Sequence, residues 1–356
     1  MCCLATHHPP IPPLGDIKFR FAELASPIPP VLLSKFRGFR GQGVWGDGVL
    51  LSNTPNGSPR EARADVPHLK YGLLALLIML ITCSLAGGLG NQLFQIANVY
   101  ALAKHLDVSF GIIEGQFAGA GTGQHPSKYY ENLFRKVPRI HVDRPLVTFK
   151  ETTWTYTRLV EQVKALLNPT SLLQLEGYFQ SDQYFLDSAK EIRELFTPEE
   201  SIQMWLKTHT TTFQLYPELF ESHDACFIGV RRGDYITKAD FHNPCGIDYF
   251  QQAMNLFPAK RYYIGSDDIA WCRENFKGDQ FVFFDISDDL TQFYLGCLFK
   301  NYIISNSTFH WWMSFLSVYE NPVIIAPDKW IFGPRAELSQ YSTIYRKGMI
   351  VINRAV

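Results

Sequence analysis

The sequence predicts an α/β protein with two layers of parallel strands, and three observations carry this prediction. Apolar runs of strand length recur along the chain, segments with helical spacing separate them, and one further helical segment divides them into two groups. Apolar strands that alternate with helices are typical of parallel sheets that are covered on both faces. The chain has 356 residues, of which 46% are hydrophobic, and this is enough for two domains.

The first 70 residues differ from the rest in composition. Ten of the 21 prolines fall there, together with glycine-rich stretches and no sustained hydrophobic period. A segment of this composition cannot bury enough apolar surface to fold on its own. We therefore expect residues 1–78 to form a disordered Pro/Gly-rich extension with an apolar end.

The apolar end of this extension has two competing interpretations. The run "YGLLALLIMLI" covers Tyr71–Ile81, and a membrane anchor through residues 71–86 is the first interpretation. A spanning helix needs about 20 apolar residues, so the run is short for that purpose. We favour the second interpretation, in which Met79–Leu85 forms the first buried strand of the folded unit.

The expected elements follow in chain order. A glycine turn leads from the first strand into a helix whose apolar residues begin at Leu93, and Val108–Ile113 fits a second strand. Further strands are expected at 172–179, 226–230, 261–265, 281–284, 301–305 and 322–327, and helices at 247–257, 269–276 and 290–300.

A linking helix is expected after Thr197, which serves as its N-cap, with Glu200 completing a capping box. Because this helix separates the two groups of strands, we place the domains at residues 79–215 and 216–356.

Two adjacent arginines follow the apolar strand in "CFIGVRRGDYI". Ligands of open α/β sheets bind beyond the carboxyl ends of the strands, so Arg231 and Arg232 are placed to face a ligand crevice. The planar fork of arginine donors matches phosphate oxygens and keeps its charge when partly desolvated. Two interpretations stay open at this point: phosphate binding, or fixing of a domain interface through Asp234.

Two further strand ends carry polar residues. The strand in "NYIISNSTFHWW" is followed by the set Ser305, Asn306, Ser307 and Thr308. Amides and hydroxyls at a helix start can bind an anion, and ordinary N-capping is the alternative. In "RYYIGSDD", Asp267 and Asp268 can accept hydrogen bonds from a purine or a ribose, or can cap the next helix.

Several classes of function are not indicated. The formal net charge of −1 gives no reason to expect nucleic acid as a partner. No Walker loop, G-x-S-x-G, H-E-x-x-H, paired C-x-x-C or Asp-x-Asp pattern occurs, so we predict neither a metal nor a cofactor. The seven cysteines are too scattered for a disulfide scaffold, and we expect most of them to be small buried hydrophobic residues.

Seven motifs occur in a specific order between residues 79 and 350. They are "GGLGNQLFQIA", "GYFQSDQYF", "VRRGDY", "CGIDYFQQAM", "YIGSDD", "ISNSTFHWW" and "DKWIFGP". Together they resemble the α-1,2-fucosyltransferases of glycosyltransferase family 11, and nothing before Met79 takes part. The resemblance implies an α/β fold of the GT-B type, with two Rossmann-like domains facing a cleft.

For function, the resemblance implies inverting, metal-independent transfer of L-fucose from GDP-β-L-fucose to the 2-hydroxyl of a terminal galactoside. The partners are then GDP-fucose, as donor substrate, and a galactose-terminated glycan. The donor-binding residues implied by position are Asn91, Gln92, Arg231, Arg232, Asp267, Ser305, Asn306, Ser307 and Thr308. Arg231 and Asp234 are the candidate catalytic residues. Without a metal, arginine and helix-end donors must stabilise the charge on the leaving GDP.

Two positions depart from the resembling motifs. Gly229 stands where H-x-R-R-G-D has its histidine, and His310 stands where a serine is common. One hypothesis is that His310 partly replaces the missing imidazole near the cleft; a helix-surface histidine is the alternative.

The general base is not identified from the sequence. Asp234 is the carboxylate nearest to the arginines, but two positive neighbours should lower its pKa, which favours a bracing role. Asp240 and Asp248 are the other candidates.

Two classes of function remain in competition. The first is an active fucosyltransferase, and the second is a nucleotide-sugar-binding pseudo-enzyme that Gly229 has left with little turnover. We expect a Golgi membrane location with a luminal catalytic domain, and the alternative is a cytoplasmic enzyme of the bacterial type.

Overall fold

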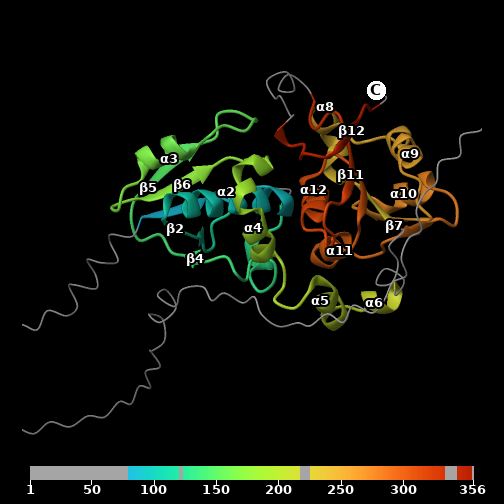
Figure 1. The fold of residues 1–356 in the computed structure, drawn as a ribbon, viewed down its shortest axis with the longest axis horizontal. Helices are drawn as coiled ribbons and strands as arrows, with labels where there is room; N and C mark the ends of the chain where they lie inside the picture. The colour runs from blue at the N-terminus through green and yellow to red at the C-terminus, as the bar shows by residue number, and fades with distance from the viewer. Residues whose placement is uncertain (1–78, 120–122, 217–224, 333–342, 355–356) are drawn as a thin grey trace, which may run out of the picture. The chain divides into compact units, whose positions relative to one another are not determined.

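The described residues form two main parallel sheets flanked by helices and a further two-stranded parallel sheet, so the predicted α/β class is confirmed (Figure 1). The computed structural model describes residues 79–119, 123–216, 225–332 and 343–354. The expected extension over residues 1–78, which includes most of the apolar run, lies outside these described residues.

The elements have the following bounds. The strands are β1 (Leu80–Cys83), β2 (Ser109–Phe110), β3 (Ile112–Ile113), β4 (Arg139–Ile140), β5 (Leu146–Lys150), β6 (Leu172–Glu176), β7 (Ala225–Val230), β8 (Arg261–Ser266), β9 (Phe281–Phe283), β10 (Asn301–Ile304), β11 (Val323–Pro327) and β12 (Ile350–Ile352). The α-helices are α2 (Leu89–Leu106), α3 (Val160–Leu166), α4 (Ala189–Phe196), α5 (Ile202–His209), α6 (Thr212–Leu215), α7 (Gly233–Thr237), α8 (Ala239–His242), α9 (Ile247–Leu256), α10 (Ile269–Asn275), α11 (Asp289–Gly296) and α12 (Thr308–Phe315). Three 3₁₀ turns lie at Pro126–Tyr129, Asp182–Tyr184 and Leu186–Ser188.

The first sheet has the strand order β2-β1-β6-β5, with all neighbours parallel. Its first strand, β1, confirms the strand interpretation of Met79–Leu85, because Ile81 and Cys83 are almost fully buried. The chain leaves β1 through a glycine turn and enters α2, as expected. Within the described ranges, none of the helices combines the length and the apolar character needed to traverse a bilayer.

The second sheet has the strand order β12-β11-β10-β7-β8-β9, again with all neighbours parallel. The chain builds outward from β7 through β8 to β9, then returns to the other side of β7 for β10 to β12. The strand order therefore reverses between β7 and β10. In a doubly wound sheet, ligands bind outside the carboxyl ends of the strands at such a switch point.

Helices cover both faces of the second sheet, which explains why β7 is buried along its whole length. Cys226, Ile228 and Val230 pack on the side of α9 and α10, whereas Phe227 packs in the cluster that contains α11 and α12 (Figure 1). Successive side chains of a strand point to opposite faces, so a strand between two helical layers needs apolar residues at every position.

Two details of the expected elements are wrong. The single strand expected over Val108–Ile113 is divided: β2 pairs with β1, whereas β3 pairs with β4, because the chain changes its partner at Gly111. The linking helix α5 has Ser201 as its N-cap, whose Oγ accepts the Met204 amide, and Thr197 instead ends α4. Pro198 follows Thr197 and favours an extended backbone there.

Two further expectations stand as follows. Among the described residues, five cysteines are free and buried, as expected for small hydrophobic residues. The predicted domain border at residues 215 and 216 falls in the connection between β6 and β7 and stays a prediction.

Candidate functional site

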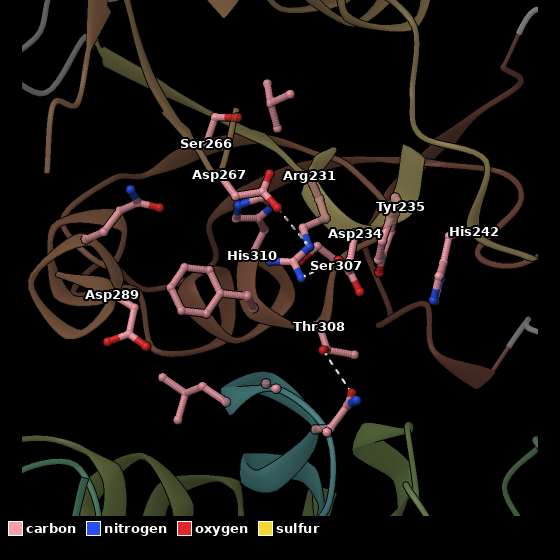
Figure 2. A pocket seen from close by; sticks show the side chains of 18 of the residues that line it. Arg231, Asp234, Tyr235, His242, Ser266, Asp267, Asp289, Ser307, Thr308 and His310 are labelled. Carbon is pink, nitrogen blue, oxygen red and sulfur yellow. Dashed lines mark hydrogen bonds and ion pairs between the residues drawn. The ribbon is translucent and has the colours of Figure 1, made fainter. Parts of the chain in front are cut away.

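A cavity of about 810 Å³ lies where strand ends from both sheets meet. Its lining comes from the segments that follow β1, β6, β7, β8 and β10, so it includes the switch point of the second sheet. This volume is within the range of about 300–1,000 Å³ that is typical of small-molecule sites. The cavity is therefore the candidate functional site (Figure 2).

Arg231 is held in the cavity by carboxylates on two elements. Its Nη2 lies 2.6 Å from Asp234 Oδ1, and its Nε lies 3.2 Å from Asp267 Oδ2. The guanidinium also lies 5.4 Å from the centre of the Tyr235 ring. Figure 2 shows Arg231 between the two carboxylates, so the charge is oriented before any ligand arrives.

Asp234 has the bracing contact that the sequence analysis favoured. Burial by itself raises the pKa of its carboxyl, but Arg231 and Lys238 outweigh burial, and the pKa lies below its ordinary value. A carboxylate with a lowered pKa is a poor acceptor of a hydroxyl proton near neutral pH. The geometry thus favours Asp234 as a support for Arg231.

Arg232 has different surroundings from its neighbour. Its guanidinium lies 4.0 Å from the centre of the Trp271 ring, and its Nε lies 3.2 Å from Asp268 Oδ2. Its backbone N–H donates to Asp267 Oδ1 at 2.9 Å. Arg232 is not part of the cavity lining, and its described contacts tie the end of β7 to α10.

The two aspartates after β8 divide the roles that the sequence left open. Asp268 caps α10 by accepting the Trp271 amide at 3.1 Å. Asp267 lines the cavity, where it contacts Arg231 and the Arg232 amide. Asp267 is thus the aspartate that can meet a ligand.

Two helix starts line the same cavity. Helix α2 begins after Gly88, which has no side chain to cap it, and helix α12 begins after Ser307, whose side chain accepts no capping hydrogen bond. Thr308 Oγ1 donates to Asn91 Oδ1 at 3.0 Å, so the two helix starts are joined. Uncapped helix amides and the positive dipole ends favour an anion at this place.

Three predicted site residues lie behind the lining and support it. The Gln92 side chain donates to the carbonyl oxygens of Gly87 and Gln124, at 3.1 and 2.8 Å. Ser305 Oγ accepts the Arg231 amide at 3.1 Å, and the Asn306 amide donates to two backbone carbonyls. All three are nearly fully buried, so they hold the loops that carry the lining residues.

Gly229 and His310 lie in contact. A Cβ atom added to Gly229 would lie 2.5 Å from Cγ and 2.6 Å from Nδ1 of His310. His310 is 3% exposed and contributes to the cavity lining, which excludes the helix-surface alternative. Burial and the nearby Arg231 lower its pKa to about 3, so its imidazole is neutral at pH 7.

The structure places several aromatic residues in the cavity that sequence reasoning missed. The rings of Trp154 and Tyr178 are stacked, with centroids 5.9 Å apart and an interplanar angle of 29°. On helices α7 and α8, the rings of Tyr235 and His242 stack with centroids 3.9 Å apart, and burial lowers the pKa of His242 to about 4. Tyr178 and Tyr235 lie inside motifs that had been singled out, "GYFQSDQYF" and "VRRGDY", whereas Trp154 and His242 gave no local signal.

Gln180 and the carboxylate of Asp289 also belong to the polar lining. Gln180 Nε2 donates to Asn91 Oδ1 at 2.9 Å, which ties the segment after β6 to α2. Asp289 at the start of α11 accepts the Tyr129 hydroxyl at 2.7 Å and lies 2.6 Å from Lys128 Nζ. The hydroxyl donation and the lysine hold Asp289 at the edge of the cavity (Figure 2).

The other candidate bases are not brought into the site. Asp240 and Asp248 are exposed and do not belong to the cavity lining. No group of three or more His, Cys, Asp or Glu side chains suited to a metal ion occurs in the part of the chain that the structure describes.

The site as a whole combines two chemical regions. Arg231 and two helix starts supply positive charge and hydrogen-bond donors, as a phosphate-bearing ligand requires. Trp154, Tyr178 and Gln180 supply apolar faces and an amide from the other sheet. Such an arrangement can hold a charged ligand and an uncharged one in the same cavity.

Comparisons with known proteins identify relatives over most of the chain. The family model described as glycosyl transferase family 11 matches residues 62–353. An alpha-1,2-colitosyltransferase of Escherichia coli is 25% identical over 296 residues, which cover 74% of this chain and 95% of that protein. The galactoside 2-alpha-L-fucosyltransferase SEC1 of Bos taurus is 27% identical over 206 residues, covering 54% of this chain and 51% of that protein.

A solved structure, the fucosyltransferase NodZ from Bradyrhizobium, is 15% identical and covers 70% of this chain and 95% of its own. Its TM-score of 0.42 is too low to support an inference about the fold.

Proposed function

Because the chain belongs to glycosyl transferase family 11, we propose that it transfers L-fucose from GDP-β-L-fucose to the 2-hydroxyl of a terminal galactoside. The family supports a glycosyltransferase of the fucosyltransferase type. The donor, the acceptor, the α-1,2 linkage, the inversion at the anomeric carbon and the GT-B cleft are parts of this proposal.

The observation that carries the proposal is the convergence of Arg231 with the starts of α2 and α12 in one cavity. Negative charge develops on GDP as the bond to fucose breaks. Donors that are already oriented stabilise such charge without having to reorganise during the reaction. In this proposal Arg231 meets the diphosphate, Ser307 adds a hydroxyl donor, and Thr308 contributes its backbone N–H at the start of α12.

The acceptor side of the proposal rests on the other sheet. Trp154 and Tyr178 present stacked, half-buried rings to the cavity, and Gln180 lies nearby with its amide fixed by Asn91. Sugar rings have apolar C–H faces that pack on aromatic rings, and hydroxyls that amides can bind. We assign this surface to the galactose-terminated acceptor.

The direct test is a transfer assay with the full-length chain, GDP-fucose and lactose. Mass spectrometry should detect a lactose product that carries one added fucose, and linkage analysis should place it on O2 of galactose. Tight GDP binding without turnover on any galactoside would instead support the pseudo-enzyme alternative. A fucose at another position would contradict the α-1,2 assignment.

Metal independence is a separate part of the proposal. If Arg231 and the helix starts neutralise the leaving diphosphate, the transfer rate should stay within about twofold after treatment with EDTA. Restoration of a lost rate by added Mg²⁺ or Mn²⁺ would contradict this assignment.

The acceptor surface makes its own prediction. Replacing Trp154 by alanine should raise the KM for lactose about tenfold and leave the KM for GDP-fucose unchanged, because the ring faces only the acceptor in this proposal. Trp205→Ala is a matched control, since Trp205 packs on α5 and α11 away from the lining. An equal change in both KM values for Trp154→Ala would contradict the assignment.

The compartment is also a proposal. The relatives include a bacterial and a mammalian protein, and we propose the Golgi lumen, with the cytoplasm as the alternative. Protease protection of the full-length chain in vesicles distinguishes the two.

A further inference from the structure

The contact between Gly229 and His310 has consequences for Arg231. Gly229 lies in the middle of the second sheet, where its neighbours in register are Gly265 of β8 and Ile304 of β10. The His310 ring lies against the bare backbone of Gly229, at distances where a Cβ atom cannot be accommodated. A side chain at position 229 and an imidazole at position 310 therefore exclude each other.

The His310 ring also belongs to a short chain of polar contacts. Its Nδ1 lies 3.2 Å from Ser305 Oγ, and this oxygen accepts the backbone N–H of Arg231 at 3.1 Å. The backbone N–H of Ser305 in turn donates to the carbonyl oxygen of Gly229 at 2.9 Å. His310, Ser305 and Gly229 thus surround the junction between Val230, where β7 ends, and Arg231.

The tautomer of His310 follows from the partners of Ser305. Among the described contacts, the Ser305 hydroxyl accepts the Arg231 amide, and the nearby group that can take its own proton is Nδ1 of His310. Nδ1 is then the acceptor, and the proton of the neutral ring lies on Nε2. A neutral ring is consistent with the positive charge of Arg231 close by.

We propose that His310 is a positioning residue, which fixes the Arg231 backbone through Ser305 and requires glycine at position 229. This inference rests on the proposed function, since Arg231 is the residue assigned to the leaving diphosphate. It adds a specific task for His310 that differs from carrying a proton: the imidazole sets the direction in which the guanidinium enters the cavity. An error of about 1 Å at such a group is enough to reduce turnover strongly.

The first experiment is a double-mutant cycle on the full-length chain with the variants G229A, H310A and G229A/H310A. In the wild-type background, the new methyl group meets the imidazole, so G229A should lower the Tm and weaken binding of GDP, measured by calorimetry. In the H310A background the space is vacant, so the same substitution should have little further effect. Additive effects of the two substitutions on Tm and on GDP affinity would overturn the proposal.

A matched control comes from another glycine that faces helix α12. A Cβ atom at Gly296 would meet the Met313 side chain, one turn further along the same helix and away from the cavity lining. The effects of G296A and H310A should therefore add. Equal coupling in both cycles would show general loosening of α12 and would count against the proposal.

The second experiment separates positioning from packing. H310N keeps a polar atom near the place of Nδ1, whereas H310Q moves it further along the side chain. We expect H310N to retain kcat/KM for GDP-fucose within about threefold, whereas H310Q and H310A lose about tenfold or more. S305A should match H310A, and the double variant S305A/H310A should be no worse than either single variant.

The two readouts keep this proposal distinct from the proposed function. If the wild-type chain transfers no fucose, the proposed function fails, but the GDP and Tm cycles still test the coupling of Gly229, Ser305 and His310. If the wild-type chain is active and H310N behaves like H310Q, the positioning role of His310 is wrong while the function stands.

Discussion

Arg231 and Arg232 are adjacent in the chain, yet their side chains have unlike environments. Arg231 lines the cavity between Asp234 and Asp267, whereas Arg232 stacks on Trp271 and pairs with Asp268. The pair was expected to act together on a diphosphate. The geometry separates the two residues, because Arg231 lines the cavity and Arg232 packs β7 against α10.

This division predicts different consequences for two neighbouring substitutions. Arg231→Ala should lower kcat/KM for GDP-fucose by about 10²–10³-fold, because it removes an oriented donor from the developing charge. Arg232→Ala should mainly lower stability, by about 0.5–2 kcal/mol, because it removes a cation–π contact. Steady-state kinetics and urea unfolding of both variants provide the measurement, and equal kinetic losses would contradict the assignment.

At the scale of elements, the site depends on how closely α2 approaches α12. A Cβ atom added to Gly90 would lie 2.5 Å from the backbone nitrogen of Phe309, so only glycine permits this contact. The hydrogen bond from Thr308 to Asn91 spans the same junction. The two helix starts can therefore line one cavity because a single position lacks a side chain.

The junction predicts a contrast between two glycines of the same turn. Gly90→Ala should destabilise the protein by about 1–3 kcal/mol and reduce GDP affinity, because backbone atoms must move apart. Gly88→Ala is the matched comparison, since its Cβ would meet nothing within 4 Å, and its free energy of unfolding should change by less than about 0.5 kcal/mol. Similar losses in both variants would show that the helix junction is not the cause.

At the scale of the whole molecule, two neutral histidines link folding to pH: His310, which is buried, and His242, which is half-buried. Burial and the nearby Arg231 lower the pKa of His310 to about 3. Burial lowers the pKa of His242 to about 4, although the nearby Asp234 acts in the opposite direction. In the unfolded chain both rings titrate near their ordinary pKa of 6.5. Between these pKa values the unfolded state binds more protons than the folded state. The contribution of the two rings to the free energy of unfolding is therefore fully present above pH 6.5 and is lost as the pH decreases.

The expected result is a loss of stability from pH 6.5 down to about pH 4 for His242 and about pH 3 for His310, with a slope of at most about 1.4 kcal/mol per pH unit for each ring. Urea unfolding at several pH values measures it. The non-titrating variant H310N should reduce the slope, because it removes one of the two rings. A slope that H310N does not alter would remove His310 as a source.

Local patterns in the sequence are sufficient for a large part of this protein. The run "CFIGV" predicted a strand buried on both faces, and the polar residues after three strand ends predicted a ligand crevice beyond the carboxyl ends of the strands. These features follow from burial and from the helix or strand period, and both are visible as a pattern of apolar residues within a short stretch of sequence. Motif order along the chain also predicted the family that the comparison confirmed.

Only the tertiary structure decided which residues meet across the cavity. Trp154 joins Tyr178 through packing of separate segments, Arg232 turns toward Trp271, and His310 fills the space above Gly229. Contacts between residues far apart in the chain leave no periodic trace, because each depends on how two elements pack. The sequence by itself therefore determined the strands, the helix starts and Arg231 at a strand end, and packing determined which side chains share the cavity.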